Sequence, residues 1–194
     1  MDVRIGVATD RDAVIRYLLM AGEGLFEHLF EDVYPGLTTT DALGVAVGDA
    51  DSPYHFENAY LVENEGEVTG CLIAFPAEQI GLPEIAYSVI PRDRLDPVLP
   101  LFTTHVPNSF YINTLAVDEA ARGQGVGGLL LDFAAELAMS TGRDSLTLHA
   151  WGDNAPALSL YRAKGFECVE RFSIPASPWL RHTGPMLLLQ RPLG

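Results

Sequence analysis

Basic residues, and lysine above all, are scarce in this sequence. Lys164 stands alone beside eleven arginines, giving 12 basic residues against 26 acidic ones and a formal net charge of −14. A protein that binds nucleic acid generally needs a basic surface to neutralise phosphates, so this charge argues against such a partner. The same acidity could attract a cationic amine over long range, although keeping the protein in solution explains it equally well.

Cysteine and long apolar runs are also scarce. Cys71 and Cys168 are the only cysteines, and each lies in a strand-like run. We therefore expect buried free thiols rather than a disulfide, as suits a reducing cytoplasm, and their spacing predicts no metal site. No apolar run reaches the length of about 18 residues that crosses a bilayer. The N-terminus shows no signal peptide, so we expect a cytoplasmic protein without a membrane partner.

Glycine, by contrast, is concentrated in one informative place. The run RGQGVG follows a strand-like apolar segment, 110–117, and opens an amphipathic helix, 126–140. Glycines let the backbone approach a ligand closely, and a helix N-terminus adds free N–H groups and the positive end of its dipole. The run therefore predicts a phosphate or pyrophosphate site, made by Arg122, Gly123, Gln124, Gly125, Val126 and Gly127.

One interpretation of these glycines is a dinucleotide site, because Gly123, Gly125 and Gly128 fit the G-x-G-x-x-G pattern. That site, however, follows the first strand of its fold and is paired with an acidic residue at the end of the next strand. Here the run lies past the middle of the chain, and Asp144 precedes the next strand-like segment. A nucleotide-dependent oxidoreductase is thus a weaker hypothesis, as is a glycine turn that binds nothing.

A second interpretation uses residues on both sides of the run. With Arg122 it fits Arg/Gln-x-x-Gly-x-Gly/Ala, and it is preceded by YINTLAV at 111–117. It is followed by the spacing Asn-x-x-Ala-x-x-x-Tyr-x-x-x-Gly-Phe, which begins at Asn154. Over about 110–172 the sequence resembles the GNAT superfamily of N-acetyltransferases, which bind acetyl-coenzyme A. Two motifs in the right order make this resemblance more specific than the glycines alone.

The resemblance implies a mixed α/β, GNAT-like acyl-CoA N-acyltransferase fold. Its central sheet is mostly antiparallel, splayed between the fourth and fifth strands, and flanked by helices. We expect one domain over 1–194, in which a proline-rich stretch at about 76–109 forms a loop-rich insertion, because proline interrupts regular helices. The patterns predict helices at about 10–21, 23–34, 39–48 and 126–140, and strands at 3–7, 59–64, 68–75, 110–117, 145–150, 167–174 and 186–190.

The resemblance also implies acetyl-CoA as the acyl-donor cosubstrate, with no metal. Carried over by position, the backbone of Leu115, Ala116 and Val117 would pair with the pantetheine arm. Main-chain N–H groups of 122–127 would hold the pyrophosphate. Asn154 would contact the pantetheine arm, and it is equally a good N-cap for the helix that follows.

Tyr161 is the candidate general acid for the departing thiolate. A phenol has an ordinary pKa of about 10, so it holds a proton at neutral pH that it can donate. The competing interpretation is a core aromatic residue.

The general base is left open. Members of the superfamily often carry a glutamate or histidine where this chain has Tyr111 and Asn113. Strand alternation would put both on one face with Leu115 and Val117, as candidates to contact the acceptor. The proton could leave through water or through a carboxylate from elsewhere, such as Glu27, Glu31, Glu57 or Glu84. The histidines at 28, 105 and 149 and Trp151 are interpreted as structural or surface residues.

Together these features predict an N-acetyltransferase that moves an acetyl group from acetyl-CoA to a primary amine by direct attack. The alternative is a non-catalytic sensor module that binds acyl-CoA. The acceptor stays open between a small-molecule amine and a peptide or protein amine. Monomer and homodimer are both open as well.

Overall fold

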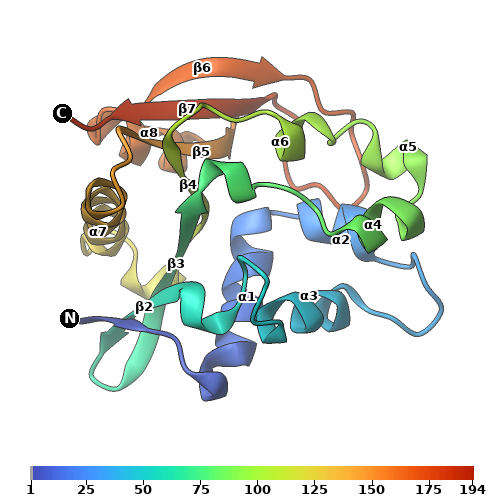
Figure 1. The fold of residues 1–194 in the computed structure, drawn as a ribbon, viewed down its shortest axis with the longest axis horizontal. Coiled ribbons are helices and arrows are strands. Elements are labelled where there is room, and N and C mark those ends of the chain that lie inside the picture. Colours follow the sequence, from blue (N-terminus) through green and yellow to red (C-terminus); the bar gives the residue numbers. More distant parts are fainter. Residues whose placement is uncertain (1) are drawn as a thin grey trace.

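The computed structural model describes residues 2–194 and is built around a seven-stranded sheet of order β1-β2-β3-β4-β5-β7-β6 (Figure 1). The strands are β1 (Asp2–Ile5), β2 (Ala59–Asn64), β3 (Glu67–Pro76), β4 (Ser109–Val117), β5 (Ser145–Trp151), β6 (Glu167–Phe172) and β7 (Met186–Pro192). The longer helices are α1 (Arg11–Gly22), α3 (Thr39–Gly48), α7 (Val126–Ser140) and α8 (Ala155–Ala163), and the shorter α2 spans Leu25–Phe30.

The sheet opens between β4 and β5, which among the strands of residues 2–194 are the one neighbouring pair that runs parallel. These strands pair only from Ser109 with Ser145 to Ile112 with Leu148. Beyond that point β4 continues to pair with β3, whereas β5 continues to pair with β7. The predicted mostly antiparallel, splayed sheet is therefore confirmed.

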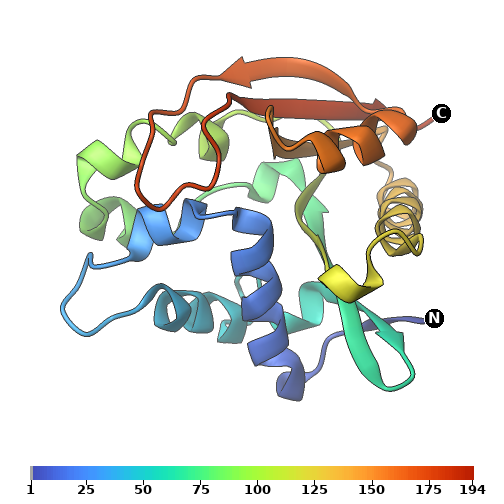
Figure 2. The ribbon, with the colours of Figure 1, turned by 180° about the vertical axis from the view of Figure 1, so that it is seen from behind.

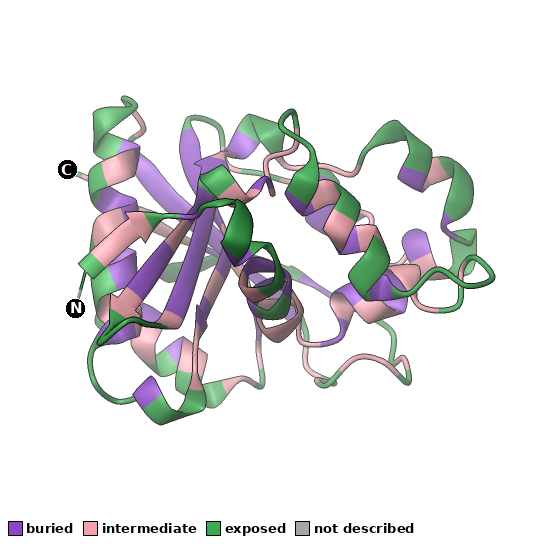
Figure 3. Ribbon diagram, turned by 90° about the horizontal axis from the view of Figure 1, so that it is seen from below, coloured by how far each residue is buried: buried purple, intermediate pink, exposed green. Residues whose placement is uncertain are grey.

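Helices cover both faces of the sheet. On one face, α7 and α8 bury Val126, Leu130 and Leu158 against Ile112 and other strand residues. On the other face, α1 buries Val14 and Leu18 in a second cluster with β3. Figure 3 shows the result, with buried strands enclosed between helices whose outer faces are exposed. Among the described residues, no helix is long and apolar enough to span a membrane.

The proline-rich stretch forms three short helices, α4 (Glu84–Val89), α5 (Arg92–Leu95) and α6 (Pro100–Thr103). Prolines stand at or next to their first turns, where the missing N–H costs nothing. Leu95, Val98 and Leu101 from this stretch pack with Trp151 and Phe172 in a third cluster. The predicted loop-rich insertion is therefore also a wall of the molecule, on the right in Figure 1.

Several local predictions were wrong. The helix expected at 23–34 is only α2, because the backbone is left-handed at Glu23 (φ 49°) and Gly24 (φ 97°) and cannot continue a right-handed helix there. Cys168 is exposed rather than buried, since β6 is an edge strand; both cysteines are free.

Candidate active site

A cavity of about 560 Å³ follows β4 through the opening of the sheet. Its wall combines α1 and α2, the glycine loop, α8 and the proline-rich stretch. The predicted residues that line it are Tyr111, Asn113, Leu115, Ala116, Val117, Arg122, Gly123, Gly125, Val126, Gly127, Asn154 and Tyr161. Gln124 is the exception, because its side-chain amide donates to the Ala120 carbonyl at 2.8 Å.

The expected alternation along β4 is interrupted at Asn113. The β3 register steps from Thr114 directly to Ile112, leaving Asn113 as a bulge. A bulge adds one residue and so reverses which face the following side chains occupy. Tyr111 accordingly packs in the α1 cluster, whereas Leu115 and Val117 pack against the α7 cluster. The prediction that Tyr111 shares a face with Leu115 and Val117 was wrong, although all of them reach the cavity.

The glycine loop lies at one end of the cavity. Gly123 (φ 73°) and Gly125 (φ 86°) hold left-handed conformations that L side chains rarely adopt, and Gly125 is the N-cap of α7. Within residues 2–194, the N–H groups of residues 123–127 donate to no protein acceptor. The N–H of Arg122, which was predicted to be part of the same site, instead donates to the Glu119 carbonyl at 3.2 Å. A run of free N–H groups at a helix start is a site for an anion.

Few positive side chains support that loop. Arg122 is exposed and donates from Nε to the Val117 carbonyl at 3.1 Å. Lys164 is paired, with its Nζ 2.6 Å from Asp132 Oδ2. An anion at this loop would therefore be bound by main-chain N–H groups and the helix terminus more than by cationic side chains.

Asn154 and Tyr161 both line the cavity, Asn154 as the N-cap of α8 and Tyr161 about two turns further along that helix. The Asn154 Oδ1 accepts the Ala157 N–H at 3.2 Å, which confirms the predicted N-cap. Tyr161 packs edge-on to Phe166 and is 8% exposed. Burial, and next the negative charge of Glu23, raises the pKa of Tyr161. Its hydroxyl therefore stays protonated at neutral pH.

The far end of the cavity is aromatic. Four aromatic rings from different segments pack in a row at tilted angles, in the order Tyr54, Phe75, Tyr111 and His149. The centroids of neighbouring rings are 5.6 to 6.0 Å apart. Such tilted pairs are the arrangement that aromatic rings favour. Because Tyr111 and Val117 are six residues apart on an extended strand, this end lies roughly 20 Å from the glycine loop.

His149 is part of this aromatic end. Its Nδ1 lies 3.0 Å from the Tyr111 hydroxyl, and its Nε2 is buried without a partner among the described residues. Burial lowers the pKa of His149 to about 4, so the ring is neutral at pH 7. The interpretation of His149 as a mere surface or structural residue missed its place in the cavity wall.

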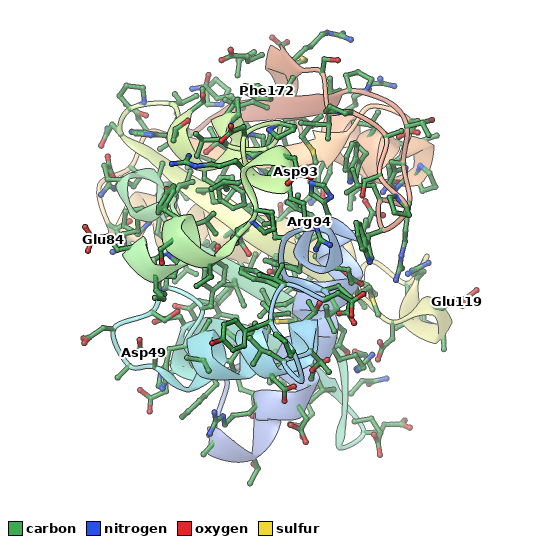
Figure 4. All side chains as sticks on the ribbon, turned by 90° about the vertical axis from the view of Figure 1, so that its right-hand side faces the viewer. Asp49, Glu84, Asp93, Arg94, Glu119 and Phe172 are labelled. Carbon is green, nitrogen blue, oxygen red and sulfur yellow. The ribbon has the colours of Figure 1, made fainter. Side chains whose placement is uncertain are left out.

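None of the four carboxylates suggested as bases lines the cavity. Glu31 accepts from the Thr39 hydroxyl, and Glu57 and Glu84 are exposed; in Figure 4 Glu84 lies at the edge of the molecule. Glu27 has one buried oxygen without a partner in the described part of the chain, but it lies outside the wall. The carboxylate in the wall is Glu23, which the sequence did not distinguish from its neighbours.

Comparison with known proteins agrees with this architecture. A solved acetyltransferase superimposes over 100% of both chains, with a TM-score of 0.65 and 25% identity. An N-acetyltransferase from Staphylococcus aureus covers 98% of this chain and is itself covered completely, with a TM-score of 0.69 and 20% identity. The fold and its open sheet are thus those of an acetyltransferase.

The family follows from the sequence comparison. Residues 25–166 match the acetyltransferase (GNAT) family, and this chain belongs to that family. The mycothiol acetyltransferase of Jonesia denitrificans is 43% identical over 63 residues, which are 32% of this chain and 20% of that protein. The chain therefore spans only about a fifth of this curated relative.

Proposed function

We propose that the protein is an acetyl-CoA-dependent N-acetyltransferase acting on a primary amine. The observation that carries the proposal is the unpaired side of β4 at 113–117, which faces the cavity between a glycine loop and Tyr161. An extended, amide-containing arm ending in a pyrophosphate has the shape and hydrogen-bonding groups that this opening lacks.

Each part of the cavity wall has its own role in this proposal. The N–H groups of 123–127 bind the pyrophosphate, and the open side of β4 at Leu115, Ala116 and Val117 orients the pantetheine arm. Acetyl-CoA supplies the activated acetyl group. Tyr161 carries a protonated hydroxyl at neutral pH, which is the proton donor for the sulfur that leaves.

The residues present fit a polyanionic thioester better than a dinucleotide. The next strand after the glycine loop, β5, carries no acidic residue that could accept from a ribose hydroxyl. Among the described residues, no group of three or more His, Cys, Asp or Glu could hold a metal ion.

Ligand-induced thermal stabilisation tests the proposal, because a ligand that binds only the folded state raises the unfolding temperature. We expect a shift with acetyl-CoA or coenzyme A and little with NAD or NADP at equal concentration. Thiol release with a panel of amines then separates an enzyme from an acyl-CoA sensor. A larger shift with NAD would overturn the proposal. If the protein binds acetyl-CoA but no amine causes thiol release, it is an acyl-CoA sensor instead of an enzyme.

A further inference from the structure

Glu23 is the carboxylate that faces the cavity. Among the described residues in the cavity wall, it alone carries a carboxylate, and Arg122 at the glycine loop is the corresponding cation. Its side chain is 25% exposed, so it can exchange protons with water. Most of the remaining wall is apolar or aromatic, which makes one carboxylate the natural partner of a cationic amine.

Two side chains hold the Glu23 carboxylate in place. Asn154 donates from Nδ2 to Oε1 at 2.9 Å, and His182 Nε2 lies 3.1 Å from Oε2. Behind it, His182 Nδ1 lies 2.9 Å from Asp153 Oδ1, and the other oxygen of Asp153 accepts the Thr183 and Gly184 N–H groups. These contacts form a continuous chain from Glu23 through His182 to Asp153.

The loop between β6 and β7 brings His182 to this position. Figure 2 shows this loop descending from the strands to the start of α2. The Arg181 N–H donates to the Glu23 carbonyl at 3.1 Å, and His182 stacks on Trp151 with a centroid distance of 5.6 Å. At Gly24 a Cβ would lie 1.9 Å from the Trp179 carbonyl oxygen, so the loop packs directly on the turn that carries Glu23.

Glu23 also lies close to the candidate general acid. Its charge contributes to the raised pKa of Tyr161, and Asn154 contacts Glu23 while capping the helix of Tyr161. The titratable groups around the carboxylate are therefore Tyr161 from α8, His182 from the loop, and Asp153 behind it. This places Glu23 beside the reacting end of the proposed acetyl-CoA site.

We propose that Glu23 is the general base, and that His182 and Asp153 position it. The assignment rests on the proposed N-acetyltransferase function. The acceptor enters as an ammonium; one N–H bond breaks, its electron pair stays on nitrogen, and the proton moves to a Glu23 oxygen. The neutral amine then uses that pair to attack the acetyl carbon, and the carbonyl π pair moves to oxygen. When that pair returns, the C–S bond breaks, and the sulfur leaves with the bonding electrons and takes the Tyr161 proton. Glu23 passes its first proton to solvent and then takes the second proton from the nitrogen, and Tyr161 is reprotonated from solvent. Because Glu23 is the one carboxylate among the described wall residues, the acceptor class that fits is an amine whose only charge near the reacting nitrogen is its own ammonium.

The direct test is Glu23→Gln, which keeps the size of the side chain and an oxygen to accept from Asn154. We expect kcat/KM for the acceptor at pH 7 to fall by roughly 10²–10⁴-fold, the usual contribution of a general base. The deficit should shrink by on the order of tenfold per pH unit as the pH rises, because alkaline solution supplies the neutral amine directly. Acetyl-CoA affinity, measured by calorimetry, should stay within about twofold.

His182→Phe tests the positioning role, since the ring can still stack on Trp151 but donates no hydrogen bond. Without that contact the Glu23 carboxylate is no longer held in position, so kcat at pH 7 should fall by a larger factor than KM changes. This deficit, like that of Glu23→Gln, should shrink as the pH rises. Glu27→Gln, which alters the neighbouring carboxylate outside the wall, is the matched control and should leave the pH profile unchanged.

Three outcomes are distinguishable with phenethylamine, spermidine and a lysine-containing peptide as acceptors. If wild type binds acetyl-CoA but releases no thiol with any of them or with a wider amine panel, the transfer function fails, and Glu23 as base fails with it. If wild type is active and Glu23→Gln matches it at every pH, the function stands and the assignment is overturned. A deficit in Glu27→Gln instead would make Glu27 the base.

Discussion

The two ends of the cavity are built in different ways. The glycine end is one continuous loop, 122–127, whose backbone conformation requires glycine at Gly123 and Gly125. The rest of the wall gathers Glu23, Tyr54, Phe75 and His149 from separate parts of the chain. A site made by backbone leaves a contiguous pattern in the sequence, whereas a site assembled by packing leaves none. The four predictions below test this contrast, from the largest expected effect to the smallest.

Tyr161→Phe, in the middle of the cavity, should lower kcat by roughly 10²–10⁴-fold, because it removes the proton donor and keeps the ring. Acetyl-CoA affinity should hardly change, since the interaction belongs mainly to the transition state. Steady-state kinetics with an acceptor from the amine panel measures this. Tyr60→Phe, in a half-buried ring packed on Phe133 of α7, is the control. Wild-type turnover in Tyr161→Phe, with chemistry rate-limiting, would make Tyr161 a packing residue.

His149→Phe should make stability less sensitive to acid at the aromatic end. The folded pKa of His149 is lowered from 6.5 to about 4, so the unfolded state binds more protons between these values. Stability of the wild type is then complete above about pH 6.5 and falls by up to about 3 kcal/mol as the pH drops to 4. Urea unfolding of both proteins between pH 7 and 4.5 should show this difference. Parallel curves would contradict the burial of an uncharged ring.

Gly125→Val should weaken acetyl-CoA binding at the glycine end about tenfold or more, because one charge-assisted hydrogen bond contributes about 1.5–3 kcal/mol. Gly66 in the β2–β3 turn offers a matched control, since it has the same φ of 86° and equally open surroundings. Both valine variants should lose about 1–2 kcal/mol of stability through the left-handed backbone. Calorimetry that finds equal affinities for the two variants would remove the loop from the phosphate site.

Asn154→Ala removes two contacts at once, because Asn154 caps α8 and also donates to Glu23. Loss of the cap should cost about 1 kcal/mol. Thr38→Ala, at the cap of α3, should cost a similar amount. Only Asn154→Ala should also weaken acetyl-CoA binding. If denaturation and binding data show the two variants to be alike in both respects, Asn154 acts as a cap alone.

The same contrast explains what the sequence could predict. The strands, α7 and the glycine loop follow from periodicity and local conformational need, and they were predicted closely. The bulge at Asn113 was not, because a bulge depends on pairing with β3 rather than on the residue itself. Glu23 was missed for a related reason: nothing near it in sequence announces His182, which lies 159 positions later and arrives through loop packing.

The opening between β4 and β5 should make amide hydrogen exchange in β4 depend on whether a ligand is bound. A strand inside a sheet normally has its amides shielded from exchange with solvent on both sides, whereas the half of β4 beyond Ile112 behaves as an internal edge. Amide hydrogens on that side should exchange quickly in the free protein, although they lie in the centre of the fold. Bound acetyl-CoA would complete the missing pairing and slow this exchange. Deuterium uptake by a peptide that contains residues 113–117 would therefore detect acetyl-CoA binding without any acceptor present.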